Sequence, residues 1–349
     1  MNTIDLSALV QSGEICDGLS LAGRDYSGAD LGGGFFSKCD FSGARLCGAR
    51  LKETVFIECD LSGADLSGAL CHHTAFHKCD LTGAAFTGAT IRLAKLTECR
   101  VREARFDGTA PVMLMVVKSD LSGAIFTQVV LDQAVFFETG MDGGDLRGAV
   151  LQRTSISGVD FRAMRIDGAR FEMAVLNQCC FRGMGLSGVA FDLCQLQGSD
   201  LSGARLDKAH LAQANFKGAS LAGATLDEAI CTRALFIDAD LQGATLRKAT
   251  LEQALLDRAN LSRADLSGAR LREAALRGAS ARDASFVGAD LTHADLSSAD
   301  LEGANLAHAS LYRAILHGVR DARAVIPGRA VALGTDSARA QAENFTPPY

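Results

Sequence analysis

Every fifth residue of this chain is apolar over most of its length. In steps of five from Leu21 to Leu316, nearly all positions hold Leu, Phe, Ile, Val or Met. The exceptions are Tyr26, Cys71, Pro111, Cys231 and Ala281. A spacing of five walks around the surface of an α-helix and gives no continuous apolar stripe, so amphipathic helices do not explain the pattern. The register never slips, which means that no repeat contains an inserted loop.

A small residue usually stands two positions before each apolar one. Between Ala204 and Ala314 this position is always Ala. Residues two apart in an extended chain point to the same side, so the small and the large side chain enter one core together. A glycine or polar residue then turns the corner, as in the stretch ADLSG at residues 264–268. The repeat therefore predicts short extended segments that alternate with tight corners.

A second period gives the length of one coil. Six charged residues alternate in sign at intervals of twenty: Lys38, Glu58, Lys78, Glu98, Lys118 and Glu138. If twenty residues form one turn, these side chains stack at about the 4.8 Å spacing of neighbouring strands, and opposite charges become neighbours. The sequence thus predicts an all-β, right-handed, quadrilateral β-helix over residues 19–317, with about fifteen coils and a length of roughly 70 Å.

With these repeats the chain resembles the pentapeptide repeat family over residues 19–316. The resemblance implies the same four-sided β-helix. The family has several unrelated binding roles, so fold alone does not give the function. Long stand-alone members are associated with bacterial secretion machinery, including type VI spike and effector assembly. The outward apolar residues and the aromatic, proline-containing C-terminus of this chain favour a non-catalytic scaffold or adaptor that binds protein partners, and the analogy suggests such an assembly as its setting.

The two ends depart from the repeat. An open β-helix exposes strand edges that favour end-to-end association unless they are capped. We expect residues 1–18 to form an N-terminal cap and residues 318–349 a C-terminal tail or cap, while an exposed end would allow a homodimer. The last residues either form an unstructured or capping terminus or dock into a partner. The docking residues would be Phe345, Pro347, Pro348 and Tyr349.

Apolar residues also occupy outward positions in the first half of the chain. They lie around residues 109–117, where Pro111 takes an inward position. Residues twenty apart share a face, so Met115 should lie between Lys95 and Val135. The predicted outward strip consists of Phe35, Val55, Ile57, Met115, Val117, Val135 and Phe137, interrupted by His77 and Lys95. Two interpretations stay open: a partner-binding surface, or scattered exposed residues, which are common on proteins.

A column of carboxylates lies on another side. Its members are Asp40, Asp60, Asp80, Asp120, Asp160, Asp200, Asp240 and Asp300. Asp is common at this position of the repeat, which favours a structural role. The alternative function is the one implied for pentapeptide repeat proteins that bind DNA gyrase and confer quinolone resistance, where carboxylates imitate a phosphate backbone. Arg100 interrupts the row and the net charge is only −6, so mimicry of a duplex, and direct binding of nucleic acid, are disfavoured.

Little in the sequence resembles an active site. The chain lacks C-x-x-C, phosphate-binding and G-x-S-x-G motifs, and a filled solenoid has no cleft in which catalytic groups converge. The residues CHH at 71–73, with His77 and Cys79, lie across a corner, which disfavours tetrahedral zinc geometry. We therefore predict no enzyme activity, no cofactor and no metal. A zinc protein or enzyme that uses this His/Cys cluster is the third and least favoured hypothesis.

Composition and the N-terminal sequence predict a cytoplasmic bacterial protein without a membrane span. The first residues lack the basic start and apolar stretch of a signal peptide, and the longest apolar run, residues 112–117, cannot cross a bilayer. Secretion without a signal peptide is the alternative. Six of the eleven cysteines share one repeat position: Cys39, Cys59, Cys79, Cys99, Cys179 and Cys194. This pattern predicts reduced, buried thiols.

Overall fold

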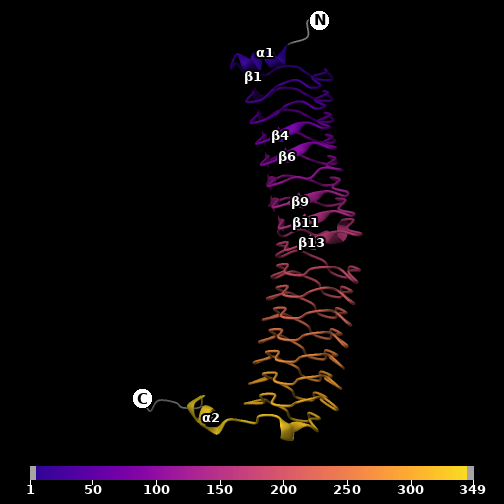
Figure 1. The fold of residues 1–349 in the computed structure, drawn as a ribbon, viewed down its shortest axis with the longest axis vertical. Helices are drawn as coiled ribbons and strands as arrows, with labels where there is room; N and C mark the ends of the chain where they lie inside the picture. The colour runs from indigo at the N-terminus through magenta and orange to yellow at the C-terminus, as the bar shows by residue number, and fades with distance from the viewer. Residues whose placement is uncertain (1–4, 344–349) are drawn as a thin grey trace. The chain divides into compact units, whose positions relative to one another are not determined.

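The computed structural model describes residues 5–343, which belong to two compact units divided in the sequence after Val175. In each unit the chain winds in turns of twenty residues, and each turn pairs in parallel with the next (Figure 1). Ile15 pairs with Phe35 in the first unit, and Cys180 pairs with Asp200 in the second. The predicted parallel β-solenoid and its twenty-residue coil are therefore confirmed.

The first unit contains the regular strands. One face is an eight-stranded parallel sheet that takes one strand from each successive coil, so this unit has eight coils. Its strands are β1 (Ile15–Asp17), β2 (Phe35–Ser37), β3 (Val55–Ile57), β5 (Ala75–His77), β7 (Lys95–Thr97), β8 (Met115–Val117), β10 (Val135–Phe137) and β12 (Ser155–Ile156). A second face has a two-stranded and a three-stranded sheet. These contain β4 (Leu70–His72) and β6 (Thr90–Arg92), and β9 (Val130–Asp132), β11 (Val150–Gln152) and β13 (Arg170–Glu172).

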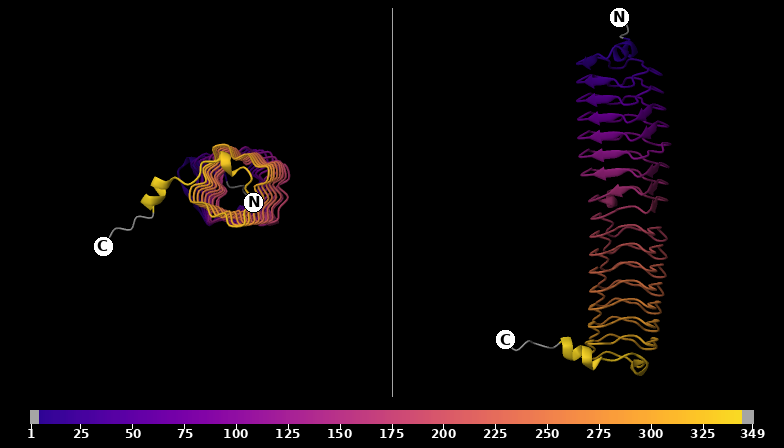
Figure 2. Two further views of the ribbon diagram at one scale, coloured as in Figure 1. Left: turned by 90° about the horizontal axis from the view of Figure 1, so that it is seen from below. Right: turned by 60° about the vertical axis from the view of Figure 1, so that its left-hand side comes forward.

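Short helices occur near the ends of the described chain and at one coil of the first unit. Helix α1 (Leu6–Gln11) precedes β1, is capped by the Asp5 carboxylate at 3.1 Å from the Ala8 amide, and buries Leu6. The 3-10 helix η1 (Phe161–Ala163) replaces a corner. The second unit ends with η2 (Arg329–Val331) and α2 (Ser337–Glu343), which projects sideways from the last coils (Figure 2). No helix within residues 5–343 is long and apolar enough to span a membrane.

The core of each unit is built from the period-five residues. Phe36, Phe56 and Phe76 stack from coil to coil with ring centroids 5.2 and 5.1 Å apart, and Phe216 stacks on Phe236 at 5.1 Å. The small residues two positions earlier are buried beside them. The sequence exceptions also face inward: Tyr26, Cys71, Pro111, Cys231 and Ala281 are buried. The interior is filled, as predicted, so a binding site is to be sought on the outer faces.

Each corner depends on a residue with left-handed backbone geometry two positions after the apolar one. Gly243 occupies it with φ of 65°, and an added Cβ there would meet no atom within 4 Å. Side chains other than glycine pay a steric cost in this region. Lys118, with φ of 50°, and Met113, with φ of 56°, nevertheless occupy it. Such corner side chains point away from the core and add to the outer surface.

Candidate interaction surface

The seven outward apolar residues predicted from the sequence all lie on the eight-stranded sheet. They are Phe35 on β2, Val55 and Ile57 on β3, Met115 and Val117 on β8, and Val135 and Phe137 on β10. The middle residue of each of these strands is buried, so its two neighbours point away from the core. Phe137 is 51% exposed and Met115 is 41% exposed, whereas Val55, Ile57 and Val117 are half-buried.

The strand register brings these residues together in two groups. Met115 pairs with Lys95 on one side and with Val135 on the other, as the twenty-residue spacing predicted. Val117 pairs with Phe137 in the same way. The groups on β2–β3 and on β8–β10 are separated by the less apolar strands β5 and β7. The surface is therefore one flat sheet with apolar ends and a more polar middle.

Sequence reasoning missed apolar residues that extend this surface. Ile15 on β1 pairs with Phe35 and is 70% exposed. It has the same outward position in its coil, although the sequence predicts that residues 1–18 form a cap. Around the corner, Met113 and Val130 are also exposed. Met113 lies in the same apolar segment, residues 109–117, as Met115, so its exposure was predictable from the sequence.

The Lys/Glu ladder runs along one edge of this sheet. All six of its residues have left-handed backbone geometry, as expected for corner positions. The structure brings Lys78 to within 4.0 Å of Glu98, and Lys118 to within 3.8 Å of Glu138. These side chains remain about half exposed, so each pair adds only about 0.2–1 kcal/mol to stability. The ladder is consequently a set of accessible charges rather than a major source of stability.

The predicted column of Asp residues has a local structural role. In Asp40, one carboxylate oxygen accepts hydrogen bonds from the Ser42 amide at 2.9 Å and the Ser42 hydroxyl at 2.6 Å. These hydrogen bonds hold the pKa of Asp40 below its usual value. Asp80 lies 2.9 Å from Arg100, and other members are paired in the same way. Two of these pairs are Arg182 with Asp200 at 2.8 Å, and Arg282 with Asp300 at 2.7 Å. A row in which carboxylates are paired with guanidinium groups is a poor copy of a phosphate backbone.

The cysteine column is also structural. The thiol of Cys59 donates to the carbonyl of Phe36 at 3.4 Å, and Cys79 donates to Phe56 at the same distance. Two further cysteines, Cys71 and Cys231, lie at period-five core positions outside this column. Burial raises the pKa of each to about 12, so both remain protonated thiols at neutral pH. None of the eleven cysteines forms a disulfide. Within the described part of the chain, no three His, Cys, Asp or Glu residues are placed to hold a metal ion.

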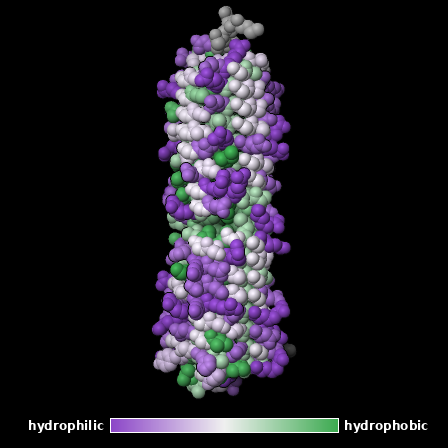
Figure 3. All heavy atoms as spheres, turned by 90° about the vertical axis from the view of Figure 1, so that its right-hand side faces the viewer, coloured by the Kyte–Doolittle hydropathy of each residue, from purple (hydrophilic) through white to green (hydrophobic). Residues whose placement is uncertain are grey.

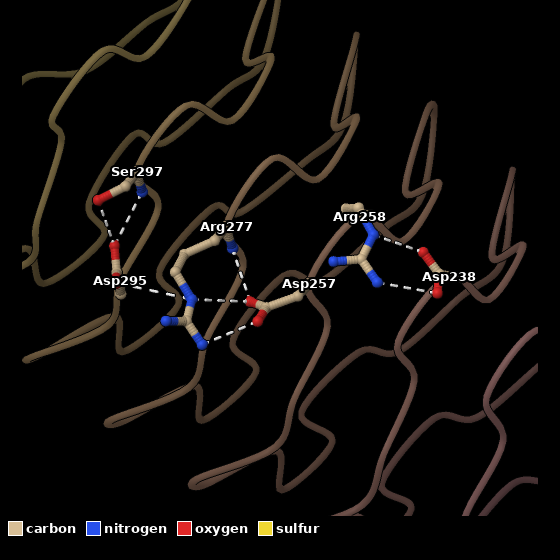
Figure 4. A network of polar contacts seen from close by, with 6 residues as sticks. All are labelled: Asp238, Asp257, Arg258, Arg277, Asp295 and Ser297. Carbon is tan, nitrogen blue, oxygen red and sulfur yellow. Dashed lines mark hydrogen bonds and ion pairs between the residues drawn. The ribbon is translucent and has the colours of Figure 1, made fainter. Parts of the chain in front are cut away.

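The second unit presents a different surface. Arg258 contacts Asp238 at 2.7 Å, while Arg277 lies 2.8 Å from Asp257 and 3.9 Å from Asp295 (Figure 4). Such pairs join consecutive coils. On the side seen in Figure 3, strongly hydrophobic residues form small separate groups among hydrophilic and intermediate residues in both units. A shallow hollow of about 290 Å³ lies over Arg233, Gln253 and Glu273, and polar side chains line it.

Comparisons with known proteins agree with this geometry. A family model described as a pentapeptide repeat region matches residues 33–106. Another, described as pentapeptide repeats, matches residues 117–153, 145–183, 194–230, 214–253, 234–272, 269–306 and 289–320. The chain belongs to the pentapeptide repeat family. None of the curated proteins matches it.

Several solved structures of this family are similar to the chain. Full-length QnrB1, a plasmid-mediated fluoroquinolone resistance protein, is 23% identical, and the match covers 55% of this chain and 92% of QnrB1 with a TM-score of 0.39. HetL from Nostoc sp. strain PCC 7120, which is involved in regulating heterocyst differentiation, is 22% identical with coverages of 96% and 98% and a TM-score of 0.16. Rfr23 from Cyanothece 51142 is 36% identical over 28% of this chain and 63% of Rfr23, with a TM-score of 0.17. At these TM-scores the similarities indicate nothing about function.

The remaining predicted binding residues are in the C-terminal tail. Phe345, Pro347, Pro348 and Tyr349 lie outside the described residues. The parallel pairing of coils continues beyond residue 317, because Asn305 pairs with Val325 and Ile315 pairs with Leu333. The part of the tail nearest the repeat therefore takes part in the last coils.

Proposed function

We propose that this pentapeptide repeat protein is a non-catalytic scaffold that binds protein through the eight-stranded sheet of its first unit. The observation that supports this function most strongly is the set of exposed apolar residues on β8 and β10. Met115, Val135 and Phe137 are each at least 36% exposed, and they lie outside the filled core. Outward apolar residues on a flat sheet favour association with another protein surface.

The geometry of the sheet suits binding better than catalysis. Each strand presents its side chains in a fixed register, so the surface needs little reorganisation when a partner binds. Catalytic groups, in contrast, must converge in a concave site from which water can be excluded. The hollow over Arg233 lies on the outer surface and is lined by polar and charged side chains.

Association with a bacterial secretion assembly is a finer proposal that rests on the resemblance to long stand-alone members of the family. Binding to DNA gyrase as a duplex mimic is the alternative, and the Arg–Asp pairs weigh against it. Supercoiling by gyrase in the presence of the purified protein tests that alternative. We expect no change at low salt, where an electrostatic effect would be strongest.

The direct test is capture of partners on immobilised protein, followed by mass spectrometry. The variant Met115→Ser/Val117→Ser/Phe137→Ser should lose partners that the wild type retains. The matched control is Ile230→Ser, which changes a 38%-exposed apolar residue in the second unit. If the triple variant folds and retains every partner of the wild type, the sheet is not the binding surface.

A further inference from the structure

We propose that the partner of this sheet is a second copy of the chain, bound face to face and antiparallel. The inference rests on the proposed function, because it names the partner of the same surface. Two copies related by a two-fold axis along the strand direction would place each column of the sheet against itself, with the order of the coils reversed. Such an isologous interface requires a surface that is complementary to itself.

The Lys/Glu ladder has this self-complementarity. Its signs alternate over an even number of coils, so reversal places every charge opposite one of the other sign when the axis passes between β5 and β7. In that arrangement Lys38 faces the partner subunit's Glu138. Lys78 faces the partner subunit's Glu98, and Glu58 faces the partner subunit's Lys118. Every other register leaves ladder charges unopposed or places like charges together, so the ladder selects this register.

The same register brings the apolar ends of the sheet together. Phe35 on β2 then faces the partner subunit's Val135, and Val55 on β3 faces the partner subunit's Met115. Ile57 likewise faces the partner subunit's Val117. The two apolar groups of one copy, which β5 and β7 keep apart, thus meet those of the other copy at these three pairs, whereas Phe137 faces the partner subunit's Ser37. Mutual burial of these side chains supplies the favourable free energy, and the ladder fixes the alignment.

The size of the sheet sets the expected strength. Six coils at about 4.8 Å give a contact roughly 29 Å long, and three extended residues at about 3.3 Å each make it roughly 10 Å wide. The resulting area of roughly 290 Å² per copy is small beside the surface of about 800 Å² per partner in a standard interface. We therefore expect a reversible dimer with a dissociation constant of about 1–100 µM. Raising the salt concentration should weaken it, because the ladder charges remain partly exposed.

One residue of the sheet opposes this arrangement. Lys95 on β7 faces the partner subunit's Ala75 next to the axis, so the two copies of Lys95 lie near each other. Dimerisation would bring like charges together and remove water from the amines. Lys95→Met should relieve both effects and lower the dissociation constant by about 10-fold, equivalent to about 1.4 kcal/mol. A gain of affinity at this position is not expected for a dimer formed elsewhere on the protein.

Charge reversal gives the decisive experiment, with sedimentation velocity over a series of concentrations as the readout. Glu58→Lys places two lysines opposite each other at two symmetry-related points of the dimer, and Lys118→Glu does the same with two glutamates. Each variant alone should bind itself at least about 10-fold more weakly than the wild type. An equimolar mixture should recover the dimer, because in the heterodimer every ladder charge again faces its opposite.

Matched reversals in the second unit provide the control. Lys208 and Glu228 also occupy corner positions of consecutive coils and lie 3.9 Å apart. Lys208→Glu and Glu228→Lys should leave dimerisation unchanged, separately and in mixture. Thermal unfolding of all four variants measures any effect of the changed charges on their neighbours within the chain, which mixing does not repair.

The outcomes separate this inference from the proposed function. A wild type that stays monomeric at all concentrations, or a dimer that ignores both reversals on the ladder, overturns the antiparallel pairing. If that monomer still captures another protein through Met115, Val117 and Phe137, the sheet is a binding surface for a different partner and the proposed function stands. A dimer that mixing restores supports both.

Discussion

The two units place the same kind of residue inside and different kinds outside. At the outward position of β8, the first unit has Met115, and the same position of the twenty-residue repeat holds Val135 in the next coil. In the second unit this position holds Gln195 and Asn215, whose side chains hydrogen-bond at 2.9 Å, and then the half-buried Leu235 and Leu255. The first polar residues of this column are thus paired along the stack, and its leucines are less exposed than Met115 of the first unit. The period-five core residues determine the fold, and the outward residues are where the two units differ.

The two units also differ in secondary structure. Regular strands occur in the first unit, where β-branched and aromatic residues flank the buried one, as in Val55-Phe56-Ile57. Within residues 176–343, coils pair through isolated bridges, such as the one between Thr225 and Thr245. Residues of high β-propensity on both sides of the core position favour such strands. They do not decide strand formation alone, because Lys95-Leu96-Thr97 forms β7 whereas Leu235-Phe236-Ile237 of the second unit pairs only through bridges.

The largest expected effect tests whether the two cores are equivalent. Phe56→Ala removes a ring stacked between Phe36 and Phe76 and should lower the free energy of unfolding by about 3–5 kcal/mol. Leu246→Ala in the second unit removes a fully buried side chain and should cost a similar amount, about 2.7–5 kcal/mol. Urea unfolding monitored by circular dichroism measures both.

The exposed Phe137 is the control for that comparison. Phe137→Ala should change stability by less than about 0.5 kcal/mol, since the ring is half outside the protein. A large loss at this position would mean that the outward residues of the first unit hold the fold together. The contrast between inner and outer positions would then fail.

Acidification should affect both units, because both use Asp carboxylates in the same manner. Hydrogen bonds from Arg147 lower the pKa of Asp145 in the first unit, and those from Arg258 lower the pKa of Asp238 in the second. A carboxyl whose pKa is lower in the folded state contributes stability above its unfolded pKa of about 3.9 and loses it as pH falls through the folded value. The urea midpoint should therefore stay level from neutral pH to about pH 5 and then decrease.

The Asp145→Asn variant isolates one contribution to this pH dependence. It should be less stable than the wild type at neutral pH, and the two should converge as the pH falls below about 4. Parallel curves at all pH values would show that the charge of Asp145 does not contribute. Hydrogen exchange can report whether the two units lose protection together.

A smaller effect is expected at the corners, where the units are alike. Gly43→Ala and Gly243→Ala each place a Cβ on a left-handed residue without a steric contact to other atoms within 4 Å. Each should cost about 1–2 kcal/mol because of local backbone strain. Equal costs in thermal or urea unfolding support a common corner, whereas unequal costs would locate a difference between the units that the backbone angles do not reveal.

The core was predictable from sequence because every inward position obeys one spacing. Even Cys71 and Pro111, which break the residue preference, keep the position and are buried. The coil length was predictable because the alternating charges become neighbours of opposite sign only if one coil has twenty residues. Lys118 and Glu138 accordingly lie 3.8 Å apart. Both inferences use a period, and a period is independent of side-chain conformation.

Contacts across coils were less predictable. Arg182 reaches Asp200 rather than a residue exactly one coil away, because a long side chain can cross to the adjacent column. The division after Val175 leaves no mark on the period-five register. The outward apolar residues were visible in the sequence, but a repeat pattern says nothing of what covers them. Their role as a binding surface stays a prediction.

The smallest effect expected concerns the ion pairs that cover the second unit. In a double-mutant cycle, Arg277→Ala and Asp257→Ala should show a coupling of about 0.2–1 kcal/mol, because Arg277 is more than half exposed and water screens the pair. Added salt should reduce the coupling further. A coupling well above this range would mean that surface pairing stabilises the second unit substantially. The paired charges would then have a structural role, and the contrast with the open apolar sheet of the first unit would be one of stability as well as of binding.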